Sequence, residues 1–487
     1  MRTARRLTLS VLVGVLVVAA APASAHENES GSAWLMEAAH HPGWYWPSTS
    51  SQTSNMEMVG SVTRTQPSST YRNSDLAFWG RLAFAGHYEG FQIIDTANPR
   101  RPQQLVDFNC PGSQHDVTVW QNLLFVSVEA PRSSPACDSV AQSPGFEGIR
   151  IFDVSNPRAP VLKAGVPTDC GSHTHTLVPD ARNGRVLLYV ASYTASVIPV
   201  SAYGNECVRF DSMGQRAHNK ISVVEVPLRN PSAASVVSEP RIPQNDFRDT
   251  PGYQGCHDIT VFMEIERAAS ACMGEGQIWD LSDLENPRTI ARIHNPNVEF
   301  FHSAAWSYDG KRVIFGDEAG GGTGPRCRPE DADTLGALWF YDTRGLDNMD
   351  GTTVEPWRSS WKVPRDQVKL TPEQAQDPNC TMHNFNTLPT KKRDVLVSSA
   401  YAAGTTVLDF SDASRVKEIG HLDPHGANTW SAYWYNGEIW TNDGGRGVDA
   451  IRVRDKAVNG TKTLRYSNPQ TQMELVSSRG RGHDWDD

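Results

Sequence analysis

The chain has 487 residues and a formal net charge of −10, with histidines counted as neutral. An acidic surface disfavours nucleic acid or an anionic lipid surface as the partner, because both carry negative charge. The length exceeds that of an ordinary single domain, so the chain contains either several domains or a repeat that extends one domain.

Residues 1–25 have the pattern of a secretory signal peptide. Three arginines near the start precede an apolar run over residues 7–20, and Ala23-Ser24-Ala25 offers a small-residue cleavage site. The apolar run is too short to span a bilayer. Removal of the three arginines changes the net charge from −10 to about −13. We therefore predict a secreted, extracellular protein without a membrane span.

Pairs of short strands recur along the mature chain. The clearest copy opens at His115 with a strand that ends at Trp120, and a tight turn leads into a second apolar strand over residues 123–128. The copies open at Ser74, His115, His173, His257, His302, His383 and Trp430. A third strand that ends in aspartate, followed by Asn-Pro-Arg, recurs at residues 91–100 and 149–158. Its proline marks a turn, because proline cannot occupy a central strand.

These units predict an all-β fold. The shortest spacings between openings, 41 to 47 residues, match a four-stranded propeller blade. Seven units without a helical period predict a seven-bladed β-propeller over residues 56–455. We expect an irregular N-terminal arm over residues 26–55 and a polar C-terminal tail over residues 456–487, which frays after about Ser467. Either Met56–Val62 or an outer strand at Thr463–Tyr466 closes the ring.

Eight cysteines in an exported chain indicate disulfides rather than a thiolate metal site. Consecutive pairing would place every bridge on loops at one rim of the propeller, and this consistent placement favours it. The predicted pairs are Cys110–Cys137, Cys170–Cys207, Cys256–Cys272 and Cys327–Cys380.

The repeated strand–Asp–(Val/Thr)–(Ser/Ala)–Asn–Pro–Arg unit resembles that of the exported LVIVD-repeat β-propeller proteins, over roughly residues 56–455. This resemblance implies the fold and export. A looser similarity is to the selenium-binding protein and methanethiol oxidase propellers, which carry histidine-bound copper. It implies that blade-opening histidines can be copper ligands, here His115, His173, His257, His302 and His383.

The inner strands of a propeller line its central channel, so the histidines that open them should converge at one mouth. His175 shares a strand face with His173. Glu318 ends a second strand at the same mouth, and Asp317 beside it is a further candidate to assist. Imidazole favours copper, zinc or iron over manganese. The predicted metal ligands are His115, His173, His175, His257, His302, His383 and Glu318. Strand alternation points Asp116 and Asp258 away from their histidines, as supporting partners rather than ligands.

Three roles remain open for the histidines. They can bind a divalent transition metal, with copper favoured; they can hydrogen-bond neighbouring blades; or they can form a protonation-dependent binding mouth. The first role predicts a copper-dependent oxidase of a small molecule. The second predicts a non-catalytic extracellular scaffold that binds a protein or glycan. The sequence contains no serine nucleophile elbow, HExxH motif or paired-glutamate signature.

Overall fold

The computed structural model describes part of the chain. The described residues are 49–63, 72–192, 219–243, 255–321, 327–328, 331–344, 346, 350–354, 357–364, 379–390 and 392–473. The predicted signal peptide, most of the predicted N-terminal arm, Cys207 and residues 474–487 lie outside them.

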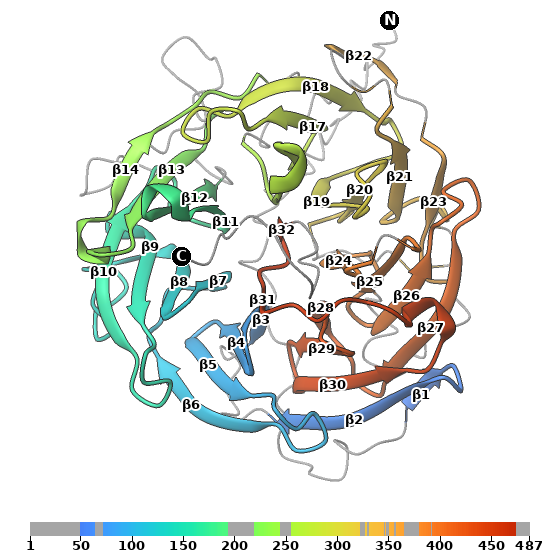
Figure 1. The fold of residues 1–487 in the computed structure, drawn as a ribbon, viewed down its shortest axis with the longest axis horizontal. Helices are drawn as coiled ribbons and strands as arrows, with labels where there is room; N and C mark the ends of the chain where they lie inside the picture. Colours follow the sequence, from blue (N-terminus) through green and yellow to red (C-terminus); the bar gives the residue numbers. More distant parts are fainter. Residues whose placement is uncertain are drawn as a thin grey trace, which may run out of the picture.

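Seven sheets surround a central axis and form a seven-bladed β-propeller (Figure 1), which confirms the predicted fold. Blade 1 contains β3 (Asn73–Trp79), β4 (Leu82–His87), β5 (Gly90–Asp95) and β6 (Gln103–Asn109). Blade 2 contains β7 (Val117–Trp120), β8 (Leu123–Arg132), β9 (Phe146–Asp153) and β10 (Val161–Pro167). Blade 3 contains β11 (Thr174–Asp180), β12 (Arg185–Ala191), β13 (Ser222–Pro227) and β14 (Ser235–Ser238). Blade 4 contains β15 (Ile259–Phe262), β16 (Arg267–Cys272), β17 (Glu275–Asp280) and β18 (Arg288–His294).

The remaining blades follow the same order. Blade 5 contains β19 (Phe301–Trp306), β20 (Arg312–Asp317), β21 (Leu338–Asp342) and β23 (Ser359–Trp361). Blade 6 contains β24 (Phe385–Thr387), β25 (Val395–Ser399), β26 (Thr405–Asp409) and β27 (Lys417–Pro424). Blade 7 contains β28 (Thr429–Tyr435), β29 (Glu438–Asp443), β30 (Gly447–Val453) and β2 (Met56–Thr63). Additional strands at blade edges are β1 (Thr49–Gln52), β22 (Asp350–Val354), β31 (Tyr466–Ser467) and β32 (Thr471–Gln472). Short 3₁₀ turns are η2 (Ala181–Asn183), η3 (Pro231–Ala233), η4 (Met263–Ile265) and η6 (Lys456–Val458).

The hydrophobic core lies between the blades. One apolar cluster fills the space between each pair of adjacent blades. Both faces of a blade are therefore covered, which explains why middle strands such as β12 are continuously apolar rather than alternating. At the blade edges, Asp95 accepts a hydrogen bond from the backbone N–H of Ala97 at 3.0 Å, and Asn98 accepts one from Arg100 at 3.1 Å. These bonds confirm the turn chemistry of the repeat.

The N-terminal strand closes the ring. β2 pairs antiparallel with β30, from Met56 opposite Val453 to Thr63 opposite Gly447. Of the two closing strands that the sequence left open, the structure contains the one from the N-terminal end.

The C-terminal segment, residues 462–473, crosses the centre of the ring (Figure 1) and differs from the expected fraying tail. β31 pairs with the inner strand β3 instead of adding an outer strand, and β32 pairs with β15. The side-chain amide of Asn468 makes two hydrogen bonds to the backbone of Val119, at 2.7 and 2.9 Å. Gln472 does the same with Trp306, also at 2.7 and 2.9 Å.

Every blade contributes hydrogen bonds to this segment. The contacts not yet named are those of Tyr435 and Asn436 in blade 7, Leu177 in blade 3, Val261 in blade 4, and Thr387 and Pro389 in blade 6. Most of these residues lie at or near the ends of inner strands, so the segment covers the end of the axis opposite the strand openings. We call this side the C-terminal face.

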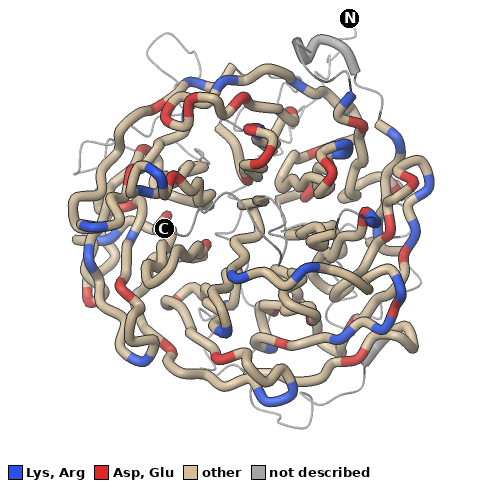
Figure 2. Tube along the Cα trace, in the orientation of Figure 1, with Lys and Arg blue, Asp and Glu red and all other residues tan. Residues whose placement is uncertain are grey.

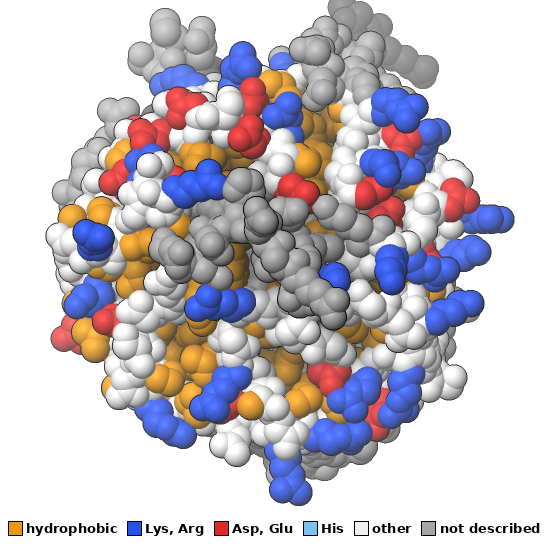
Figure 3. Space-filling view, viewed as in Figure 1, with side chains coloured by type: hydrophobic (Ala, Val, Ile, Leu, Met, Phe, Trp, Pro, Cys, Tyr) orange, Lys and Arg blue, Asp and Glu red, His pale blue; other side chains and the backbone are white. Residues whose placement is uncertain are grey.

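Exposed lysines and arginines border the C-terminal face (Figures 2 and 3). Some of them pair with the aspartates of the repeat turns: Arg81 with Asp95 at 3.5 Å, and Arg288 with Asp280 at 3.1 Å. Exposed ion pairs contribute little stability. The apolar packing between blades therefore remains the main stabilising contribution.

Three of the four predicted disulfides are confirmed: Cys110–Cys137, Cys256–Cys272 and Cys327–Cys380. Cys170 is also disulfide-bonded, and its predicted partner Cys207 lies outside the described residues. These bridges fit an oxidising compartment. In the part of the chain that the structure describes, no helix has the length and apolar character needed to cross a bilayer.

Candidate metal centre

Four histidines from adjacent blades form a continuous buried row. His173, His257 and His383 lie just before the inner strands of blades 3, 4 and 6, and His302 lies at the start of β19 in blade 5. Nε2 of His173 is 2.8 Å from Nε2 of His257. The ring centroid of His302 is 3.8 Å from that of His257 and 4.5 Å from that of His383. The repeat therefore brings together four of the five histidines that were predicted to converge, and the fifth, His115, bonds the backbone of His87 instead.

Carboxylates from the ends of second strands meet this row. Glu318, directly after β20, places Oε2 at 3.4 Å from Nε2 of His302 and Oε1 at 3.3 Å from Nε2 of His383. The hydroxyl of Tyr401 donates a hydrogen bond to Oε1 of Glu318. At the other end of the row, Oε2 of Glu129 accepts a hydrogen bond from Nδ1 of His173 at 2.5 Å.

Two groups of three residues have the compactness that a metal ion requires. One consists of His257, Asp258 and His302, and the other of His302, Glu318 and His383; the ligand atoms within each lie within 4.8 Å of one another. All of these residues are buried. The chain is thus a β-propeller with buried histidine–carboxylate groups that can hold a metal ion.

Hydrogen bonds fix the tautomer of His383. Its Nδ1 lies 2.5 Å from the backbone carbonyl oxygen of Trp430. Because a carbonyl only accepts, Nδ1 carries a proton, and Nε2 is the ring nitrogen that faces Glu318. Metal-binding histidines commonly donate their second ring N–H to a carbonyl or carboxylate in this way.

The first two histidines of the row differ in charge. Burial opposes protonation of His173, but the charge of Glu129, its hydrogen bond and the charges of Asp258 and Glu318 together outweigh burial and raise the pKa of His173. Burial, together with the charge of His173, holds the pKa of His257 well below its usual range. Nε2 of His173 therefore carries the proton and donates a hydrogen bond to Nε2 of His257.

Three predicted ligands, His115, His173 and His175, lie outside both groups. His173 still belongs to the row, but the other two have different neighbours. Nδ1 of His115 donates to the backbone carbonyl of His87, in the neighbouring blade, at 2.6 Å. His175 instead contacts the side chains of blade 2: its Nε2 lies 2.7 Å from Oγ1 of Thr118, and its Nδ1 lies 2.8 Å from Oγ of Ser127.

The aspartates that follow His115 and His257 behave differently from each other. Oδ2 of Asp116 accepts the backbone N–H of His175 at 2.8 Å, in keeping with a supporting role. Asp258 was expected on the face opposite His257, but its Oδ1 lies 3.1 Å from Nδ1 of that histidine. β15 begins only at Ile259, so strand alternation does not apply to residues 257 and 258.

Asp317 supports the backbone rather than the metal groups. Its Oδ1 accepts the backbone N–H groups of Glu299 and Phe300 at 3.0 and 2.8 Å, and its Oδ2 accepts that of Gly336 at 2.9 Å.

We expect Asp317→Ala to lower the free energy of unfolding by about 3 kcal/mol or more, because it leaves buried N–H groups unpaired. Urea denaturation measures the change. The control is Asp412→Ala, which removes an exposed turn aspartate that also accepts a backbone N–H; a loss no larger than that of this control would contradict the buried role of Asp317.

His115 should make stability depend on pH. Burial lowers its pKa to about 3, so the folded protein keeps the ring neutral while the unfolded chain protonates near pH 6.5. The unfolded state then binds more protons, and stability falls as the pH drops from about 6.5 towards 3. The loss from this group between pH 7 and 4.5 is about 2–3 kcal/mol.

The change His115→Asn should reduce this pH dependence by that amount, whereas exposed His425→Asn should not. Denaturant unfolding at both pH values measures the effect. Equal pH dependence in wild type and His115→Asn would be inconsistent with a buried neutral His115.

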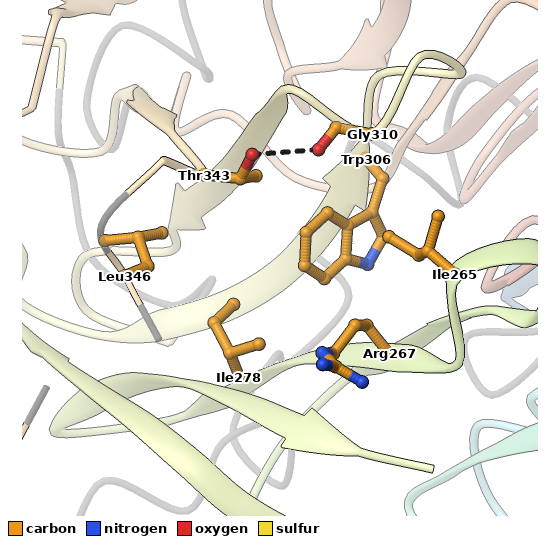
Figure 4. Close-up of a pocket in the computed structure, with 7 residues that line it drawn as sticks. All are labelled: Ile265, Arg267, Ile278, Trp306, Gly310, Thr343 and Leu346. Carbon is orange, nitrogen blue, oxygen red and sulfur yellow. Dashed lines mark hydrogen bonds between the residues drawn. The ribbon is translucent and has the colours of Figure 1, made fainter. Parts of the chain in front are cut away.

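A separate cavity of about 250 Å³ lies between blades 4 and 5 (Figure 4). It is lined by Ile265, Arg267, Ile278, Trp306, Gly310, Thr343 and Leu346. Trp306 ends the strand in which His302 lies four residues earlier, so the cavity is roughly 13 Å along the strand from the histidine row. Its lining combines apolar side chains with Arg267 and Thr343 and includes no histidine, cysteine or carboxylate, so it offers no metal ligand set.

Comparisons with known proteins show distant similarity of fold. A candidate 6-phosphogluconolactonase from Bacteroides uniformis is 10% identical, with a TM-score of 0.48, over 78% of this chain and 92% of that one. The computationally designed Ika8 protein is 11% identical, with a TM-score of 0.42, over 82% of this chain and 100% of that one. Neither likeness bears on activity. No family model and no curated protein matches the chain.

Proposed function

We propose that this protein is an exported metalloprotein in which His302, Glu318 and His383 hold a divalent transition metal, with copper favoured. One observation carries the proposal: the two oxygens of the Glu318 carboxylate lie 3.4 and 3.3 Å from Nε2 of the two histidines. Ligands at 2.0–2.2 Å from one tetrahedral ion are roughly 3.3–3.6 Å apart. These donors therefore already have nearly the spacing that an ion needs.

The chemistry of the donors supports the choice of metal. Imidazole nitrogens with a carboxylate suit copper, zinc or iron. Among the divalent first-row transition metals, copper is generally bound most tightly by a given site. Nε2 of His383 and Oε2 of Glu318 are buried and make no hydrogen bond to any described residue, which leaves them available as ligands. The similarity of the blade-opening histidines to those of the methanethiol oxidase propellers supports copper as well.

We extend the proposal to an oxidase that acts on a small, sulfur-containing molecule. In that reaction the substrate loses two electrons and two protons, and dioxygen gains them to form hydrogen peroxide. A bound copper ion would supply the one-electron redox chemistry. Tyr401 orients the Glu318 carboxylate, the Trp430 carbonyl orients His383, and Glu129 holds a proton on His173.

A second candidate function is a non-catalytic extracellular scaffold that binds a protein or glycan. One observation favours it: the histidines His115 and His383 both bond a backbone carbonyl of a neighbouring blade. The side chains of Thr174 and Ser303 link adjacent blades in the same way. In this case the histidines stiffen the ring and the loops bind the partner.

Elemental analysis of the protein secreted by its own host, without an affinity tag, separates the two candidates. Near-stoichiometric copper supports the metal centre if it is lost in a folded His257→Ala/His302→Ala variant and retained in His425→Ala, which changes an exposed histidine. The absence of metal above background, with a double variant that is merely less stable, supports the scaffold.

A further inference from the structure

We propose that this centre holds two metal ions, with His302 as their shared ligand. The inference rests on the proposed function, which places one ion at His302, Glu318 and His383. It adds a second position at His257, Asp258 and His302. His302 is the one residue common to the two compact groups among the described residues.

The second position has suitable donors. Nδ1 of His257 and Oδ1 of Asp258 lie 3.1 Å apart. Two ligands of one ion at about 2.0–2.2 Å have a similar separation, so an ion can replace the proton between these atoms after small side-chain shifts. Both side chains are almost fully buried, with 1% and 3% of the residue exposed. Buried charges are normally paired or coordinate a metal.

The surroundings of His257 favour an ion on its Nδ1. Metal binding there sends the Nδ1 proton to solvent, and the proton between His173 and His257 moves onto Nε2 of His257. That N–H then donates to Nε2 of His173, 2.8 Å away, and Nδ1 of His173 donates to Glu129. The result is the carboxylate–histidine–metal arrangement that orients metal ligands in proteins, lengthened by one histidine.

The position of His302 allows it to serve both ions. Its ring lies between those of His257 and His383. Nε2 faces Glu318, which assigns Nδ1 to the second position. An imidazole that binds through both nitrogens releases its ring proton and becomes an anion.

The charges then balance. The His302 anion and the carboxylates of Asp258, Glu318 and the partly exposed Glu129 supply four negative charges along the row, and two divalent ions supply four positive charges. Charge pairing of this kind is what permits ions to be buried.

Copper loading with two independent readouts tests the inference. Metal-free protein is mixed with excess Cu(II), freed of unbound copper by gel filtration, and analysed for copper per chain by mass spectrometry. The electron paramagnetic resonance signal of the same sample is integrated. We expect two copper ions per chain. The integrated signal should account for much less copper than is bound, because a shared imidazole anion couples the two spins magnetically.

Matched variants locate the two ions. Asp258→Asn should bind one copper ion with a full uncoupled signal, and Glu318→Gln should also bind one. Exposed Asp412→Asn should bind two. Circular dichroism of the metal-free variants checks that each is folded.

One copper ion in the wild type, retained in Asp258→Asn, overturns the second position and leaves the proposed function intact. No bound copper in the folded wild type contradicts the proposed function itself. The wild-type stoichiometry decides between these outcomes even if a variant fails to fold.

Discussion

Removal of residues 462–473 should destabilise the whole propeller, with a loss on the order of 5 kcal/mol. The segment bonds to all seven blades, and its buried hydrogen bonds each contribute roughly 1 kcal/mol. Truncation also removes the side-chain partners of the backbone groups of Val119 and Trp306, which adds to the cost. A loss of this size is a large fraction of the stability of most domains.

Guanidinium denaturation under non-reducing conditions measures the effect. The point variant Gln472→Ala should give part of the loss, because it removes both bonds to the backbone of Trp306. Thr463→Ala changes an exposed residue of the same segment and should have little effect. An unchanged unfolding midpoint for the truncated protein would mean that the segment only covers the face and does not hold the blades together.

The variant His302→Ala should lower copper affinity at least about 100-fold, because it removes a donor from both compact groups. Tyr401→Phe should have a smaller effect, about 10-fold to 100-fold, since it removes only the hydroxyl that orients Glu318. Isothermal titration of metal-free protein with Cu(II) gives the affinities.

The order of these effects is informative. His425→Ala, the exposed-histidine control, should bind copper as the wild type does. If His302→Ala retained wild-type affinity while His425→Ala lost it, the copper would sit on surface histidines and the buried row would not be the site.

The repeat predicts the fold because each blade needs only local signals: an apolar strand pair, a turn aspartate and a proline. It also predicts the histidine row, because residues that open equivalent strands must lie at one end of the axis. These signals do not determine which ring atom faces which neighbour. His115 opens blade 2 as His257 opens blade 4, yet His115 donates to a carbonyl while His257 contacts Asp258.

Other features depend on the exact positions of single residues, which a strand pattern does not determine. Asp258 joins a metal group because β15 begins one residue after it. His175, two residues beyond His173, lies deeper in the ring and meets blade 2. The C-terminal segment carries no strand periodicity, and its order comes from partners that are distant in sequence, such as Val119 and Trp306 for Asn468 and Gln472.

The most direct test of the central claim is a crystal structure of copper-loaded protein with anomalous diffraction measured on both sides of the copper edge. We expect an anomalous peak within about 2.0–2.2 Å of Nε2 of His302, Nε2 of His383 and an oxygen of Glu318. A map without a peak in the histidine row, from crystals whose solution contains excess copper, would contradict the claim and leave the histidines as links between blades.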